Sequence, residues 1–120
     1  MPVRSLSSSV LRWPDWETVH RAARDWAETV VQQKPGVVRV GYFGSYARGD
    51  WGVGSDLDLV AVVEESKERF ERRAASWDLT GLPVPADVLI YTAEEWAALK
   101  TRDRFGKTLM AEIAWLYQRK

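Results

Sequence analysis

An otherwise apolar run of this sequence begins with a pair of aspartates. Asp56 and Asp58 stand at the beginning of a predicted strand, Asp56–Val63. Side chains two residues apart in a β-strand point to the same face, so the two carboxylates project together while Leu57 and Leu59 point into the core. Neighbouring carboxylates repel each other and raise each other's pKa unless a cation lies between them. The sequence therefore predicts a strand with a cation-binding end.

A glycine-rich loop, Gly44–Gly54, comes before this strand and follows another predicted strand, Val37–Phe43. The loop opens with Gly44 and Ser45, and glycine lets backbone N–H groups approach a ligand closely. Such N–H groups at the start of a helical turn attract phosphate, and Arg48 adds a permanent positive charge. A glycine loop alone usually only turns the chain, so its value here comes from the aspartates that follow it.

A third predicted strand, Ala86–Tyr91, repeats the pattern with one acidic residue, Asp87, among apolar side chains. A buried carboxylate without a partner is costly, so Asp87 either pairs with an arginine or serves a site. If it lies beside Asp56 and Asp58, the three carboxylates form a cluster of hard oxygen ligands that suits Mg²⁺. Such a cluster is typical of two-metal phosphoryl transfer, with the ions roughly 4 Å apart.

The rest of the chain predicts helices that cover these strands. Apolar residues recur every three or four positions between Pro14 and Pro35, which indicates an amphipathic helix. The stretch Ser66–Leu79 suits a surface helix, and Thr92 with Glu95 forms a capping-box pattern before a further helix to about Lys100. A last helix is predicted over Gly106–Arg119. Strands that alternate with helices predict an α+β fold with a mixed β-sheet and helices packed against it.

Two aromatic residues near these segments are expected to have structural rather than chemical roles. His20 is the one histidine of the chain and lies beside the apolar stripe of the first helix, where a structural or surface role is expected. Trp51, in the glycine loop, is expected to pack within the protein rather than stack on a nucleobase.

Composition limits the remaining possibilities. The 120 residues suit a single domain over 1–120, with a Ser-rich, frayed segment at 1–12. The 17 basic and 17 acidic residues cancel, so direct nucleic-acid binding is not expected. Cysteine is absent, which excludes disulfides, and no apolar run resembles a secretory signal or a membrane helix. A cytoplasmic location is therefore expected, with no membrane association.

The spacing of these motifs resembles a known superfamily. Gly44-Ser45, ten further residues and then Asp56-Leu57-Asp58 are similar to the signature of nucleotidyltransferases related to polymerase beta. Ala47-Arg48-Gly49 and Ser55 resemble the minimal nucleotidyltransferase branch, many of whose members are antitoxins paired with HEPN-type ribonuclease toxins. The match runs from Val37 to about Tyr91.

The resemblance implies a nucleotidyltransferase palm and assigns roles to particular residues. Gly44 and Ser45 would hold the triphosphate of ATP, with Arg48 and Ser55 as further nucleotide-binding residues. Asp56 and Asp58 would bind two Mg²⁺ ions, for which Mn²⁺ could substitute. Asp87 would bind one of these ions and help to deprotonate the acceptor hydroxyl.

Three functions remain open from the sequence. The first is transfer of AMP from ATP to a hydroxyl on a partner HEPN toxin, by an antitoxin. The second is modification of a small molecule, although the chain has no added helical domain for such an acceptor. The third is an antitoxin that binds without catalysis, against which the intact Asp56, Asp58 and Asp87 argue. The acceptor, the preferred base and the oligomeric state, whether homo- or hetero-oligomeric, are not determined.

Overall fold

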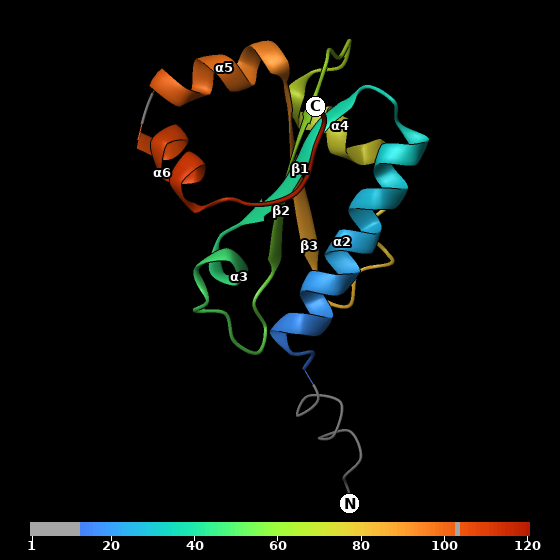
Figure 1. Cartoon of the computed structure of the whole chain (residues 1–120), viewed down its shortest axis with the longest axis vertical. Coiled ribbons are helices and arrows are strands. Elements are labelled where there is room, and N and C mark those ends of the chain that lie inside the picture. The colour runs from blue at the N-terminus through green and yellow to red at the C-terminus, as the bar shows by residue number, and fades with distance from the viewer. Residues whose placement is uncertain (1–12, 103) are drawn as a thin grey trace, which may run out of the picture.

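The computed structural model describes residues 13–102 and 104–120, so the expectation for residues 1–12 lies outside the described part (Figure 1). The helical segments are α2 (Trp16–Gln33), α3 (Ser45–Arg48), α4 (Phe70–Arg73), the 3₁₀ turn η1 (Ala74–Ser76), α5 (Ala93–Arg102) and α6 (Arg104–Glu112). The strands are β1 (Val37–Phe43), β2 (Leu57–Val63), β3 (Ala86–Thr92) and β4 (Ala114–Gln118). None of the helices in the described ranges has the length and apolar character needed to cross a membrane.

The four strands form one mixed sheet in the order β3-β2-β1-β4. β2 and β3 run parallel, whereas β1 is antiparallel to both β2 and β4. The predicted α+β fold with a mixed sheet is confirmed. The three strands expected from the sequence are present within one residue of their predicted bounds.

Helices cover both faces of the sheet and create two cores (Figure 1). The long helix α2 packs on one face, where its buried side chains Val19, Ala23 and Trp26 join Leu57 and Leu59 of β2. On the other face, α5 and α6 pack over the remaining β2 side chains, Val60 and Val62 among them. Because β2 is a central strand that is buried on both faces, its sequence is an almost continuous apolar run.

The long helix α2 forms as its sequence predicts. Asp15 caps its N-terminus by accepting a hydrogen bond from the Thr18 backbone N–H at 2.9 Å, and the helix ends before Pro35. On its inner side, His20 stacks on Trp16 and shares a 2.9 Å hydrogen bond with the Tyr42 hydroxyl. His20 therefore ties the helix to β1, which agrees with the structural role expected for it.

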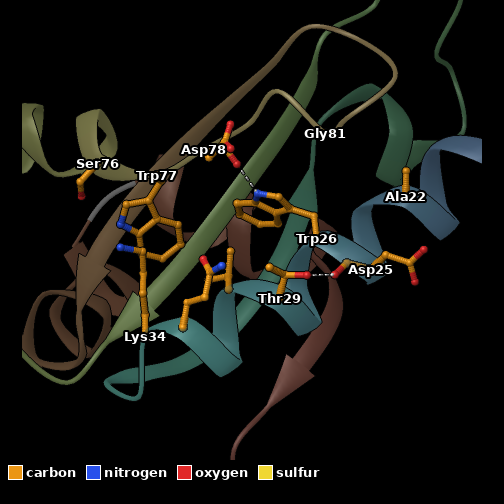
Figure 2. A pocket seen from close by; sticks show the side chains of 11 residues that line it. Ala22, Asp25, Trp26, Thr29, Lys34, Ser76, Trp77, Asp78 and Gly81 are labelled. Atoms are coloured by element: carbon orange, nitrogen blue, oxygen red, sulfur yellow. Dashed lines mark hydrogen bonds between the residues drawn. The ribbon is translucent and has the colours of Figure 1, made fainter.

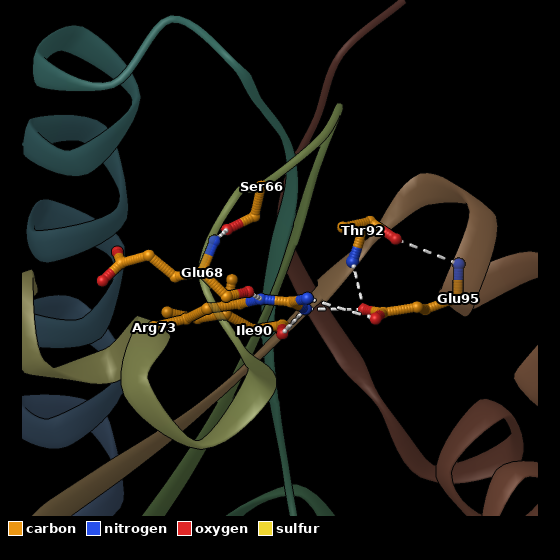
Figure 3. Close-up of polar contacts among 6 residues, drawn as sticks. All are labelled: Ser66, Glu68, Arg73, Ile90, Thr92 and Glu95. Carbon is orange, nitrogen blue, oxygen red and sulfur yellow. Dashed lines mark hydrogen bonds and ion pairs between the residues drawn. The ribbon is translucent and has the colours of Figure 1, made fainter.

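The predicted capping box at the start of α5 is also present and is part of a larger network (Figure 3). The Glu95 backbone N–H donates to the Thr92 hydroxyl, and the Thr92 backbone N–H donates to the Glu95 carboxylate. The same carboxylate pairs with the buried guanidinium of Arg73 at 2.6 Å, and Arg73 also donates to the Ile90 carbonyl. This network fastens α4 and α5 to β3.

The predicted surface helix over Ser66–Leu79 is wrong in its extent. The structure contains only α4 and η1 in this stretch. Side chains here hydrogen-bond to nearby backbone instead: Ser66 accepts from the Glu68 N–H, and Asp78 accepts from the Thr80 N–H. Such local bonds compete with helical ones and shorten the helix.

The predicted last helix over Gly106–Arg119 is wrong in its second half. Helix α6 ends at Glu112, and the chain continues as β4 along the edge of β1. Trp115 and Tyr117 favour strands, and β1 would otherwise leave its outer backbone groups unpaired. A short apolar run can satisfy a helical period and still form a strand when a sheet edge is available.

Candidate active site

The candidate site lies where β1 ends and where β2 and β3 begin. In the sheet, Asp58 is the register partner of Phe43 on β1 and of Asp87 on β3. Register partners on neighbouring strands point to the same face. Asp58 and Asp87 therefore share one face, which alternation along β2 assigns to the side of Val60 and Val62, under α5 and α6.

Gly44 makes the turn from β1 into α3 and passes close to Asp58. Its φ of 77° and ψ of −153° belong to a region that only glycine adopts readily. A Cβ atom at this position would collide with the Asp58 carboxylate oxygen Oδ2. The Gly44 carbonyl then accepts 3.0 Å hydrogen bonds from the backbone of Ala47 and Arg48, which closes the short helical turn. Glycine is thus required at 44 both by the backbone and by the approaching carboxylate.

Two adjoining pockets meet at Asp58. The first has a volume of about 460 Å³ and contains every sequence-predicted site residue except Asp87; its lining residues are Phe43, Gly44, Ser45, Arg48, Ser55, Asp56, Asp58, Phe105, Thr108, Leu109 and Glu112. The second has a volume of about 390 Å³ and brings Asp87 together with Asp58. Phe43, Asp58 and Phe105 line both pockets, and the two phenyl rings meet edge to face at 6.5 Å.

Electrostatics at the site are dominated by negative charge around Asp58. Burial raises the pKa of the Asp58 carboxyl above its ordinary value of 3.8, and the charges of Asp56 and Asp87 raise it further. Arg48 opposes this shift, whereas Glu112 adds to it. A bound cation would offset the repulsion among these carboxylates.

The residues fit a divalent ion by chemistry, although their side chains are not closed around one. No group of three or more His, Cys, Asp or Glu side chains within 13–102 and 104–120 is arranged to hold a metal ion. The carboxylates of Asp56, Asp58 and Asp87 nevertheless supply the hard oxygen donors that Mg²⁺ prefers, and their charges act on a common group. The predicted metal ligands remain a prediction.

Two predicted nucleotide-binding side chains already have protein partners. The Arg48 guanidinium donates to Asp50 at 3.1 Å and to Glu112 at 3.2 Å. The Ser55 hydroxyl accepts a 2.9 Å hydrogen bond from the Gly52 N–H, which braces the loop. Both residues still line the first pocket, so their role toward a nucleotide remains a prediction.

Trp51 packs against the protein. Its ring stacks on Tyr46 with the centroids 5.5 Å apart, and it lies at the margin of the core beneath α2. The expected packing role is confirmed.

Glu112 and Phe105 were not expected at the site. Both belong to α6, and the sequence places them dozens of residues from the glycine loop. Glu112 arrives there because β4 pairs with the end of β1, with Ala114 opposite Tyr42. A sequence signal for this contact is absent, since the segment after Glu112 reads equally well as helix.

A separate groove of about 400 Å³ lies between α2 and the segment after η1 (Figure 2). Two of its polar groups are engaged within the protein: the Trp26 indole donates to the Asp78 carbonyl at 2.8 Å, and the Lys34 ammonium lies 5.3 Å from the Trp77 ring. The groove lacks the glycine turn and acidic strand ends that mark the first site, so we assign no chemistry to it.

The protein has a mixed sheet, and a glycine turn and acidic residues lie together at one end of its strands. This arrangement defines an α+β domain of the palm type. Comparison with known families agrees with this class. The family model described as nucleotidyltransferase domain matches residues 24–111, and the chain belongs to this family. None of the curated proteins compared with the chain matches it.

Solved structures share the fold. A proposed nucleotidyltransferase from Sulfolobus solfataricus matches with a TM-score of 0.61 and 23% identity, over 98% of this chain and 91% of that one. A toxin–antitoxin structure with AMP-PNP matches with a TM-score of 0.57 and 14% identity. A mutant MntA–HpeT toxin–antitoxin structure gives 0.54 and 11%, and both toxin–antitoxin matches cover 81% of this chain and 74% of the other. The resemblance to nucleotidyltransferases seen in the sequence is confirmed.

Proposed function

We propose that this protein is a metal-dependent nucleotidyltransferase that moves AMP from ATP to a hydroxyl group. The acceptor lies on a partner toxin of the HEPN type, so that the chain acts as an antitoxin. One observation carries the proposal: Asp58 and Asp87 are register partners on parallel strands, and the Gly44 turn passes against Asp58. Phosphate-binding and acidic groups thus converge at one end of the sheet.

Each residue has a defined task in this mechanism. The Gly44 and Ser45 turn and Arg48 bind and orient the triphosphate, because backbone N–H groups and a guanidinium favour phosphate oxygens. Asp56 and Asp58 would hold Mg²⁺, joined by Asp87, and the metal would offset charge on the phosphates and lower the pKa of the acceptor hydroxyl. Asp87 accepts the proton of that hydroxyl. The acceptor oxygen then bonds to the α-phosphorus while the bond to the β-phosphate breaks, and pyrophosphate leaves.

The second pocket supports an acceptor that comes from another molecule. It adjoins the nucleotide pocket at Asp58, carries Asp87, and has the Phe105 ring, which is 48% exposed, on its border. The solved relatives named as toxin–antitoxin complexes support a protein partner, and the one with AMP-PNP supports an adenine nucleotide. No feature of the described residues favours a small-molecule acceptor over this one.

Thermal unfolding tests nucleotide and metal binding directly. Saturating ATP with Mg²⁺ should raise the melting temperature by several degrees, because a ligand that binds only the folded state stabilises it by mass action. Mg²⁺ alone should do less, since Mg²⁺ takes much of its coordination from substrate phosphates. If no nucleoside triphosphate shifts the transition with either Mg²⁺ or Mn²⁺, the non-catalytic antitoxin becomes the better account.

A further inference from the structure

One carboxylate occupies the donors that a triphosphate would need. The Glu112 oxygen Oε1 accepts a 2.7 Å hydrogen bond from the Gly44 backbone N–H and a 3.2 Å hydrogen bond from the Arg48 guanidinium. The Glu112 side chain is only 14% exposed, whereas the Arg48 side chain is half exposed. An anionic oxygen therefore already lies on the turn that the proposed function gives to a phosphate oxygen.

The position of Glu112 is imposed by the fold. It is the last residue of α6, and two residues later Ala114 pairs with Tyr42 at the end of β1. The backbone of Glu112 is thus held beside the Gly44 turn, and only its side chain can swing away. Arg48 also pairs with Asp50 at 3.1 Å, so its guanidinium keeps one carboxylate partner if Glu112 leaves.

Glu112 and a phosphate cannot share these donors. A carboxylate and a phosphate both present acceptor oxygens, so the two compete for the same N–H. Their charges also repel at contact distance in a partly buried site, where screening by water is incomplete. A nucleotide that uses the Gly44 turn must therefore displace the carboxylate.

We propose that Glu112 is an internal competitor for the nucleotide, which occupies the phosphate position of the Gly44 turn and must be displaced before a triphosphate binds. This inference rests on the proposed function, because it concerns the same pocket. Glu112 lowers the affinity of the free protein for nucleotide, and it keeps the Gly44 turn ordered while no nucleotide is bound. Any partner that draws the Glu112 side chain away from the turn would then promote nucleotide binding.

Replacement of Glu112 provides the test, with AMP-PNP and Mg²⁺ as the probe and calorimetry as the readout. Glu112→Gln keeps an oxygen that can accept from the Gly44 N–H but removes the charge. Its Kd for AMP-PNP should fall roughly tenfold, the scale of one partly screened charge contact. Glu112→Ala should bind at least as tightly as Glu112→Gln. Glu64→Gln is the matched control, since Glu64 also pairs with an arginine, Arg119, at the far end of β2, and it should leave the Kd unchanged.

The outcomes separate this inference from the proposed function. If the parent binds AMP-PNP and both Glu112 variants bind equally or more weakly, Glu112 supports the turn and competition is refuted. If the parent and both variants all fail to bind, the proposed function fails and this inference fails with it. A second measurement uses only the parent protein, so it does not require any variant to fold. AMP-PNP should shift the NMR signals of the Gly44 amide and of the Glu112 carboxylate together. An unchanged Glu112 signal at saturation also refutes displacement.

Discussion

Replacing Gly44 by alanine should damage both the stability and the nucleotide site of this protein. The backbone at 44 has a φ of 77° and a ψ of −153°, a conformation that costs a non-glycine residue about 1–3 kcal/mol. The new methyl group would also meet the Asp58 carboxylate, and an overpacked contact costs about 1–3 kcal/mol more. The free energy of unfolding should therefore fall by roughly 2–6 kcal/mol, which lowers the melting temperature by at least about 6 °C.

Gly54→Ala is the matched control for this change. Gly54 also has a positive φ, of 90°, but a Cβ there has no atom within 4 Å. Its loss should be limited to backbone strain of about 1–2 kcal/mol. The assay is thermal unfolding of both variants, followed by AMP-PNP binding with Mg²⁺, which Gly44→Ala should weaken at least about tenfold because Asp58 must shift. Equal losses of stability for the two variants would refute the close approach of the turn to Asp58.

Three further predictions concern charge, a buried ion pair and the edge strand. Asp58→Asn should stabilise the protein at neutral pH when a chelator keeps it free of metal, because burial and two neighbouring aspartates raise the pKa of Asp58 above the ordinary 3.8 in the folded state and disfavour its charge. The gain in melting temperature should vanish as the pH of the measurement falls toward 3.8. A gain that persists at every pH would contradict this cause. Glu95→Gln should cost about 1–3 kcal/mol because it leaves the buried Arg73 guanidinium without its carboxylate, whereas Glu94→Gln on the exposed side of α5 should change little; similar melting temperatures for the two variants would contradict the network. Gly41→Ala should disrupt the pairing of β1 with β4, because its Cβ would lie 2.7 Å from the backbone carbonyl oxygen of Ala114, and hydrogen exchange across residues 114–118 should accelerate; full protection there would contradict the strand.

Much of the fold could be predicted because its signals are local. β-branched and aromatic runs mark β1, β2 and β3, and the capping box marks the start of α5. The site was likewise predictable where neighbours in sequence are neighbours in space, as for Gly44 and Ser45, or where strand alternation places Asp56 and Asp58. The pairing of Asp58 with Asp87 required only that the two strands be adjacent.

The failures of prediction concern long-range contacts. The segment after Glu112 has no local property that rejects a helix, and only the open edge of β1 makes it a strand. The contact between Glu112 and the Gly44 turn depends on that pairing, so it could not be seen in the sequence. The same holds for Arg73, whose burial depends on Glu95 from another element rather than on its own helical pattern.

A single assay tests whether this chain transfers AMP, as proposed, and whether Asp87 takes the proton from the acceptor. The direct measurement is transfer of label from ATP to a co-expressed HEPN-type partner, with Mg²⁺, for the parent and for Asp87→Asn. The variant keeps the shape of Asp87 without its charge, so it should retain much of its ATP binding while transfer falls on the order of a hundredfold or more. Asp58→Asn should instead weaken binding and transfer together. Transfer by Asp87→Asn at the parent rate would contradict the role of Asp87, and no transfer by the parent to the co-expressed partner would contradict the enzymatic account.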